Sequence, residues 1–171
     1  VLNKNFKVFN FAFNGYGPHQ FLSKIENNYL TEIKDCKKLF VFYQFIPDHI
    51  GRVAGKRSWG DKSPRYQIKD EKLISDGFFT NFPYKIVMKL RKNFRSSKVI
   101  NIFYQVDSTN DRDNQLFLKI LLEIEKKLKQ KFYNSEFIYI LWDDMNGKDT
   151  SISSFFSRRD RINIKDLNIK E

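Results

Sequence analysis

Residues 37–46, KKLFVFYQFI, form an almost unbroken apolar run in a chain that is otherwise rich in charge. Such a run is typical of a strand that is covered on both faces, as in a parallel sheet. It is well short of the roughly 20 apolar residues that a membrane-spanning helix needs, and the chain does not open with a signal peptide. The run therefore predicts a strand inside a soluble domain with no transmembrane segment.

Strands and helices alternate on both sides of this run. Strands are predicted at 7–13, 98–106 and 137–142, and helices at 21–33, 83–94 and about 110–132. This alternation is typical of right-handed crossovers and a mostly parallel sheet with helices on both faces. The sequence therefore predicts a single α/β domain over residues 1–171, a three-layer fold with a flavodoxin-like arrangement.

Two further segments of the sequence allow more specific predictions. Residues 47–80 are polar and rich in Gly, Pro and Ser, and we interpret them as a functional excursion or a small hairpin around RYQIKDEKLI, residues 65–74. In the helix at 83–94, Asn81 is a candidate cap. The helical spacing is expected to turn a set of apolar side chains inward: Ile86, Val87, Leu90 and Phe94.

Polar residues follow the predicted strands, where the ligand site of an open α/β sheet lies. Asn14 and Gly15 follow the first strand, Asp48 and His49 the second, and Asp107 the third. After the fourth strand come Asp143 and Asp144. Asp and Asn also favour turns and helix caps without any chemistry, so both interpretations stay open for each residue.

Composition narrows the function classes. The single cysteine, Cys36, excludes an internal disulfide and a thiolate zinc site, and we predict neither a metal site nor a cofactor. The formal net charge of +11 favours anionic partners, nucleic acid among them. Alternatively, the positive charge has no binding role, because many of the lysines lie on solvated helix faces.

The segment FNFAFNGYGPHQFL, residues 9–22, has a glycine-rich turn between a predicted strand and a helix. Such a turn can direct free backbone N–H groups at a developing negative charge, and Gly15 would let a substrate approach closely. The turn matches neither G-x-G-x-x-G nor a P-loop. His19, in the first helical turn, is expected to be structural.

This segment resembles the second sequence block of SGNH (GDSL-type) hydrolases, with Asn10, Ala12 and Gly15 at the matching positions. The segment KLFVFYQFIPDHIGR lies where that family has its third block. The resemblance covers about residues 5–80 and implies an SGNH-hydrolase-like fold. It also implies a serine esterase that cleaves O-acyl esters of a glycan or lipid, with the Gly15 N–H in the oxyanion hole, and a location in the cell envelope.

Three features depart from the family pattern. The sequence has no Gly-Asp-Ser, Pro47 stands where the third block has Asn, and no Asp-x-x-His follows the last strand. The missing blocks at both ends would be explained if the chain is an internal fragment, whereas Pro47 predicts weak or altered activity. The catalytic serine and histidine are not identifiable, and Asn14, Asp48, His49 and Asp107 remain candidates for the substrate pocket.

The alternative hypothesis is a basic nucleic-acid-binding protein or a Mg²⁺-dependent nuclease. Asp48 followed by Asp70-x-Lys72 loosely matches the pattern in which two carboxylates hold Mg²⁺ and a lysine assists the water. The segment around Asp70 is a poor candidate for a buried strand, and no motif of an RNA-binding module is present.

Overall fold

The computed structural model describes residues 6–57, 60, 62–97, 108–141 and 150–163. Its centre is a parallel sheet of three strands in the order β1-β4-β5. The strands are β1 (Leu39–Phe45), β4 (Ser135–Leu141) and β5 (Arg161–Asn163). β1 and β4 confirm the strands predicted at 37–46 and 137–142, and they pair along their whole length, with Tyr43 opposite Tyr139.

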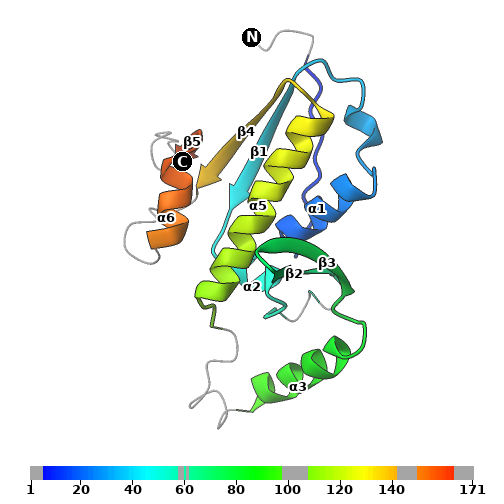
Figure 1. The fold of residues 1–171 in the computed structure, drawn as a ribbon, viewed down its shortest axis with the longest axis vertical. Coiled ribbons are helices and arrows are strands. Elements are labelled where there is room, and N and C mark those ends of the chain that lie inside the picture. The colour runs from blue at the N-terminus through cyan, green and yellow to red at the C-terminus, as the bar shows by residue number, and fades with distance from the viewer. Residues whose placement is uncertain (1–5, 58–59, 61, 98–107, 142–149, 164–171) are drawn as a thin grey trace, which may run out of the picture.

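One face of this sheet packs against the long helix α5 (Asp111–Lys131) and against α6 (Thr150–Ser157) (Figure 1). The Phe45 ring lies 5.3 Å from Phe117 of α5 and 5.0 Å from Phe156 of α6, measured between ring centroids. The Tyr139 hydroxyl donates to Glu125 of α5 over 2.5 Å. α5 buries residues at helical spacing, which confirms the predicted helix: Phe117, Ile120, Leu121, Ile124 and Leu128.

Helix α1 (Pro18–Glu26) and the short helix α2 (Asp48–Val53) pack beside α5. α1 begins where the sequence allows it, with Pro18 in the first turn. The Gln20 side chain accepts a hydrogen bond from the Gly17 N–H over 2.8 Å. A 3-10 turn, η1 (Thr31–Ile33), follows and buries Ile33.

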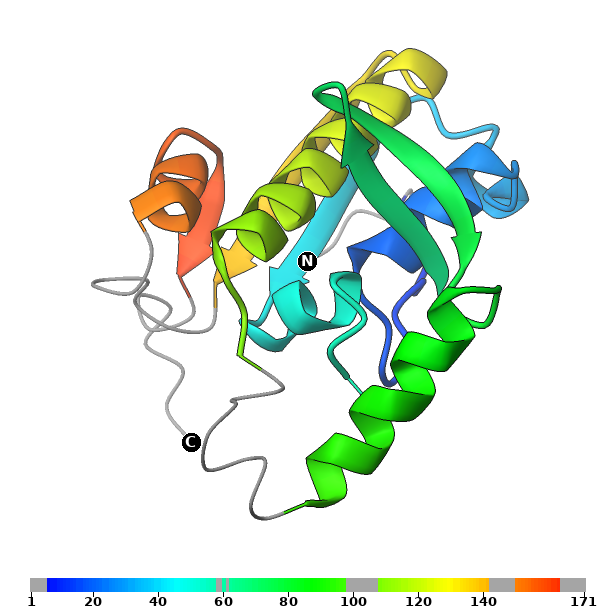
Figure 2. The same cartoon turned by 60° about the horizontal axis from the view of Figure 1, so that its bottom comes forward.

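An antiparallel hairpin of β2 (Pro64–Lys69) and β3 (Lys72–Phe78) confirms the hairpin predicted at 65–74. The hairpin lies across α1 and α5 (Figure 2). The Tyr66 hydroxyl donates to Glu26 of α1 over 2.6 Å, and the Lys119 ammonium of α5 donates to the Glu71 carbonyl at the hairpin turn over 2.5 Å. The turn needs positive φ at Asp70 and Glu71, which explains why this segment is not a buried strand.

Two expectations about the sheet differ from the structure. Residues 7–13 are not a strand: Phe9 and Phe11 pack against the core and Val8 is exposed, as alternation predicts, but Phe13, which should share the face of Phe11, is exposed too. Alternation alone is insufficient, because a strand also needs a neighbour for its backbone hydrogen bonds. The second difference is in β1, where Phe40 and Phe42 are 37% and 58% exposed, so the described residues cover only one face of that strand. The strand predicted at 98–106 lies outside the described residues.

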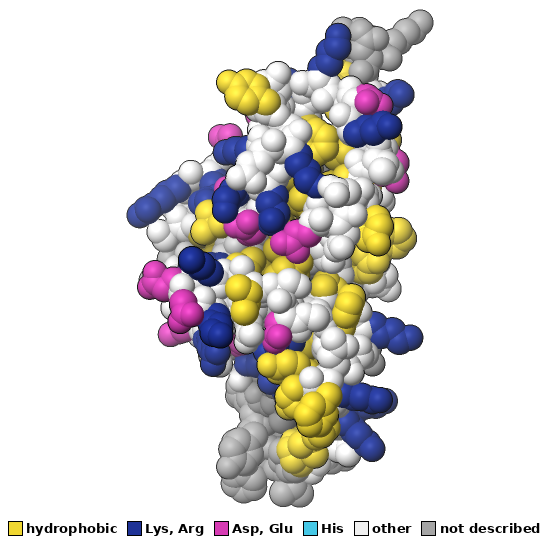
Figure 3. Space-filling model, turned by 45° about the vertical axis from the view of Figure 1, so that its right-hand side comes forward, with side chains coloured by type: hydrophobic (Ala, Val, Ile, Leu, Met, Phe, Trp, Pro, Cys, Tyr) yellow, Lys and Arg dark blue, Asp and Glu magenta, His cyan; other side chains and the backbone are white. Residues whose placement is uncertain are grey.

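The predicted helix at 83–94 is present as α3 (Tyr84–Ser96), but its expected burial is wrong. Ile86, Val87, Leu90 and Phe94 are each 40–52% exposed. They lie on one stripe of the helix, because Leu90 and Phe94 follow Ile86 by about one and two turns and Val87 is next to Ile86. Apolar and basic side chains meet at the lower end of the molecule, where α3 lies (Figure 3). Asn81 accepts a backbone hydrogen bond from Lys85 through its carbonyl, and the cap position itself is Pro83.

The described residues thus form a mixed α/β domain with a parallel sheet and helices, together with a separate hairpin. Among the helices of these residues, none combines the length and the apolar character needed to cross a bilayer.

Candidate functional site

The glycine-rich turn and the start of α2 meet at the carboxyl end of β1. Gly15 has a φ of +80°, a left-handed conformation that glycine adopts without steric cost. The turn is closed by the Tyr16 N–H, which donates to the Phe13 carbonyl over 3.0 Å. Gly15 is half-buried, Asn14 is exposed, and within the described part of the chain the Gly15 N–H has no hydrogen-bond acceptor.

Arg52 of α2 connects this turn to Asp48. Its Nη1 donates to the Tyr16 carbonyl over 2.5 Å, and its Nε donates to the Asp48 carboxylate over 2.7 Å. The Arg57 Nε donates to the other oxygen of the same carboxylate. The turn and Asp48, 30 or more residues apart in the sequence, are therefore held at one end of β1.

These contacts determine the ionisation of Asp48. Partial burial raises the pKa of its carboxyl group, but the hydrogen bonds and charges of Arg57 and Arg52 outweigh burial, so the pKa lies below its ordinary value. Asp48 is thus a carboxylate at neutral pH and positions two arginines. It is poorly suited to act as a general acid.

His49 lies next to Asp48 but turns toward the sheet. Its Nδ1 shares a hydrogen bond of 2.7 Å with the Tyr43 hydroxyl of β1. The pKa of His49 is lowered to about 4, chiefly by burial and also by the positive charge of Arg52, while Asp48 opposes the shift. The ring is therefore neutral at pH 7, the form in which an imidazole nitrogen can accept a proton.

His19 is a feature of this site that the sequence does not reveal. The ring is 1% exposed, and neither of its nitrogens has a hydrogen-bond partner among the described residues. Its pKa is lowered to about 3, chiefly by burial and also by the charges of His49 and Arg52. An unsatisfied buried polar group costs about 1–3 kcal/mol. His19 is thus a buried neutral imidazole beside His49, and only its place in the first turn of a helix was visible in the sequence.

Gly17 allows these groups to pack closely. A Cβ atom at this position would lie 3.0 Å from Cε1 and Nδ1 of His19 and 3.3 Å from the Cβ of Arg52. The second glycine of the turn therefore has a packing role, distinct from the backbone role of Gly15.

The nuclease pattern does not converge in the structure. The Asp48 carboxylate faces Arg52 and Arg57, whereas Asp70 lies in the hairpin turn beside the contact of Lys119. In residues 6–57, 60, 62–97, 108–141 and 150–163, no group of three or more His, Cys, Asp or Glu side chains could hold a metal ion. Asp107, Asp143 and Asp144 lie outside the described residues.

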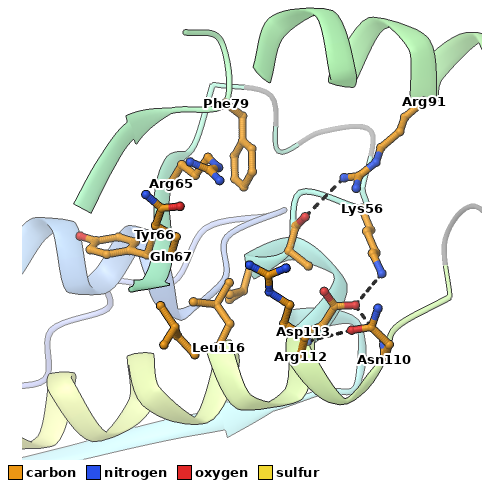
Figure 4. Close-up of a pocket in the computed structure, with 13 residues that line it drawn as sticks. Lys56, Arg65, Tyr66, Gln67, Phe79, Arg91, Asn110, Arg112, Asp113 and Leu116 are labelled. Carbon is orange, nitrogen blue, oxygen red and sulfur yellow. Dashed lines mark hydrogen bonds and ion pairs between the residues drawn. The ribbon is translucent and has the colours of Figure 1, made fainter. Parts of the chain in front are cut away.

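A cavity of about 320 Å³ opens at the other end of α2 (Figure 4). Val53, Ala54 and Lys56 form one wall, the hairpin a second, and Arg91 of α3 and the first turn of α5 the others. The two ends of α2 thus border two different features, the glycine-rich turn and this cavity.

Known proteins offer no further guide. No family model, curated protein or solved structure matches this chain.

Proposed function

We propose that this chain is an SGNH-type hydrolase-like domain with weak activity toward O-acyl esters of a glycan or lipid. The observation that supports the proposal is the glycine-rich turn. It places a half-buried backbone N–H, that of Gly15, which has no acceptor among the described residues, in a turn bonded to the helix that follows β1. Backbone N–H groups of this kind stabilise the negative oxygen of an acyl-transfer intermediate.

The neighbouring side chains fit such chemistry. Asp48 and Arg52 hold the turn against α2, so that the N–H is positioned before substrate binds. His49 is a neutral imidazole at the same end of β1 and a candidate for binding or for proton transfer. The nucleophile would come from a Gly-Asp-Ser block, which this sequence does not contain.

The proposal carries a finer expectation for the fold. In a three-layer α/β hydrolase, the strand predicted at 98–106 belongs to the central parallel sheet, and helices cover both faces. The exposed faces of Phe40, Phe42 and the α3 stripe would then be covered in the intact domain.

The test is the hydrolysis of p-nitrophenyl acetate by the natural protein, compared with the variant Gly15→Ala. A side chain at φ +80° costs about 1 kcal/mol in strain and displaces the N–H. Because one oxyanion donor contributes about 10²–10³ in kcat, we expect kcat to fall by at least about tenfold with KM little changed.

Gly77→Ala is the matched control. Gly77 lies in β3 with a φ of +72°, and an added Cβ would also meet the Asn81 amide nitrogen at 2.6 Å, so alanine there strains the fold at least as much but in a different element. An equal loss of kcat in both variants would assign the effect to strain alone and refute the role of Gly15. Absence of hydrolysis by the natural protein would refute the hydrolase proposal as a whole.

A further inference from the structure

The cavity beside α2 gathers positive charge from four different elements. Its lining includes four cationic side chains, Lys56, Arg65, Arg91 and Arg112, and one carboxylate, Asp113. The lysine follows α2, and the arginines come from β2, α3 and α5 respectively. Figure 4 shows the Arg112 side chain reaching from α5 into the space between the hairpin and Lys56.

Two of these four charges are compensated within the protein. The Lys56 ammonium pairs with the Asp113 carboxylate over 2.5 Å and also donates to the Ser108 carbonyl over 2.8 Å. Arg65 pairs with Asp76 of β3, and its guanidinium lies 3.3 Å from the ring centroid of Tyr84.

For the other two charges, the described residues show no ion pair with a carboxylate. Arg91 donates to the neutral carbonyls of Ala54 and Gly55, over 3.4 and 3.0 Å. No ion pair joins Arg112 to an acidic group among the described residues. A net charge of about +2 therefore faces the cavity.

Arg112 is an exposed side chain in the first turn of α5, between Asp111 and Asp113. It is the second residue of α5, and the positive end of the helix dipole disfavours a cation in the first turn. Arg112 also repels Arg65: burial lowers the pKa of the Arg65 guanidinium, Tyr84 opposes this shift, and the charge of Arg112 adds to it. A bound anion would remove both penalties at once.

The volume and the apolar walls of the cavity restrict the size and chemistry of the ligands that it can hold. About 320 Å³ is at the lower end of small-molecule sites. Phe79, Leu116 and Tyr66 give the cavity apolar walls next to the cations. Guanidinium groups bind the oxygens of phosphate with paired hydrogen bonds.

We infer that this cavity binds the dianionic phosphate group of a small phosphate monoester, with Arg112 and Arg91 on the phosphate oxygens and the carbon part of the ligand against Phe79 and Leu116. The inference does not depend on the hydrolase proposal, because it concerns the opposite end of α2 and no reacting group.

The test is calorimetric titration of the whole protein with phenyl phosphate at pH 8 and constant ionic strength. Phenyl phosphate is a dianion there, because the second pKa of a phosphate ester is about 6. Phenyl sulfate, a monoanion of similar shape, is titrated in parallel. We expect one site for phenyl phosphate, binding that weakens with added salt, and weaker binding of phenyl sulfate.

The variant Arg112→Gln should weaken phenyl phosphate binding by about tenfold or more, the loss of one charge-assisted hydrogen bond. Lys129→Gln is the matched control, since it removes the same charge from an exposed position near the far end of α5. We expect it to change the affinity by less than about twofold, because charges beyond a Debye length are screened.

Thermal unfolding without ligand separates binding from a structural role. Because Arg112 opposes the helix dipole, Arg112→Gln should keep or raise the unfolding temperature of the free protein, whereas loss of a structural contact would lower it. Equal weakening by Arg112→Gln and Lys129→Gln, or no saturable binding of phenyl phosphate, would overturn the inference. Equally tight binding of phenyl sulfate would overturn the preference for a dianion.

Discussion

Mild acid should destabilise this protein through its two histidines. His19 and His49 are the only histidines of the chain, and burial lowers their pKa values to about 3 and about 4, from an ordinary value of 6.5. The unfolded state therefore binds more protons than the folded state between pH 6.5 and these values. The free energy of unfolding is highest above pH 6.5 and falls as the pH drops below it.

The size of the effect follows from the two shifts. Each group lowers stability by about 1.36 kcal/mol for every pH unit below 6.5 until its folded pKa is reached. At pH 5 each histidine has lost about 2 kcal/mol, and the pair about 4 kcal/mol. This is a large part of the 5–15 kcal/mol that is typical of a whole domain.

Urea unfolding at pH 7.5 and at pH 5.0 measures this loss, in the wild type and in His19→Leu. The substitution removes one titrating ring, and since that ring has no hydrogen-bond partner among the described residues, leucine breaks no described hydrogen bond there. The acid loss should therefore shrink by about half, to about 2 kcal/mol. If His19→Leu shows the same acid loss as the wild type, His19 titrates normally and is not buried as described.

Two further substitutions test the contacts that hold the site together. Asp48→Asn removes the carboxylate that both Arg52 and Arg57 contact and should lower the free energy of unfolding by about 1–3 kcal/mol in urea titration. Glu123→Gln removes two longer ion pairs, to Lys126 and Lys127 at 3.4 and 3.5 Å. It should cost less than about 1 kcal/mol, and equal costs would contradict the role of Asp48. Gly17→Ala brings a Cβ to 3.0 Å from the His19 ring and should lower the unfolding free energy by about 1–3 kcal/mol. Gly60→Ala, where the nearest atom is 3.7 Å away, should be better tolerated; the reverse order would refute the packing argument.

The elements that depend on local patterns were predictable from the sequence. The apolar run of β1, the helical spacing in α5 and the proline at the start of α1 each determine an element by nearby residues alone. The hairpin was also predicted, although its turn residues, Asp70 and Glu71, adopt positive φ and no glycine indicates such a turn in the sequence.

Properties that depend on distant neighbours were not predictable. Residues 7–13 have the alternation of a strand in sequence but pair with no strand among the described residues, and α3 has an amphipathic stripe that the same residues leave exposed. Periodicity indicates which side chains share a face and does not say what covers that face.

The candidate site likewise has features that residue type predicts and features that depend on the tertiary fold. The left-handed turn at Gly15 was suggested by residue type, because glycine is the residue that adopts such a turn freely. The two arginines that bind Asp48 were missed, because Arg52 and Arg57 follow it in an ordinary polar segment. The four cations of the cavity come from residues 56–112, and only the tertiary fold brings them together.

The contact of Arg52 with Tyr16 limits how this protein can vary. Arg52 binds the backbone carbonyl of residue 16, and every amino acid supplies that group. The hydrogen bond of Arg52 therefore does not restrict the residue type at position 16, where the Tyr16 ring lies beside Phe13 and Lys24, whereas positions 48, 52 and 57 depend on one another for their ion pairs. Random mutagenesis with selection for folded protein should thus recover more residue types at position 16 than at positions 48, 52 and 57.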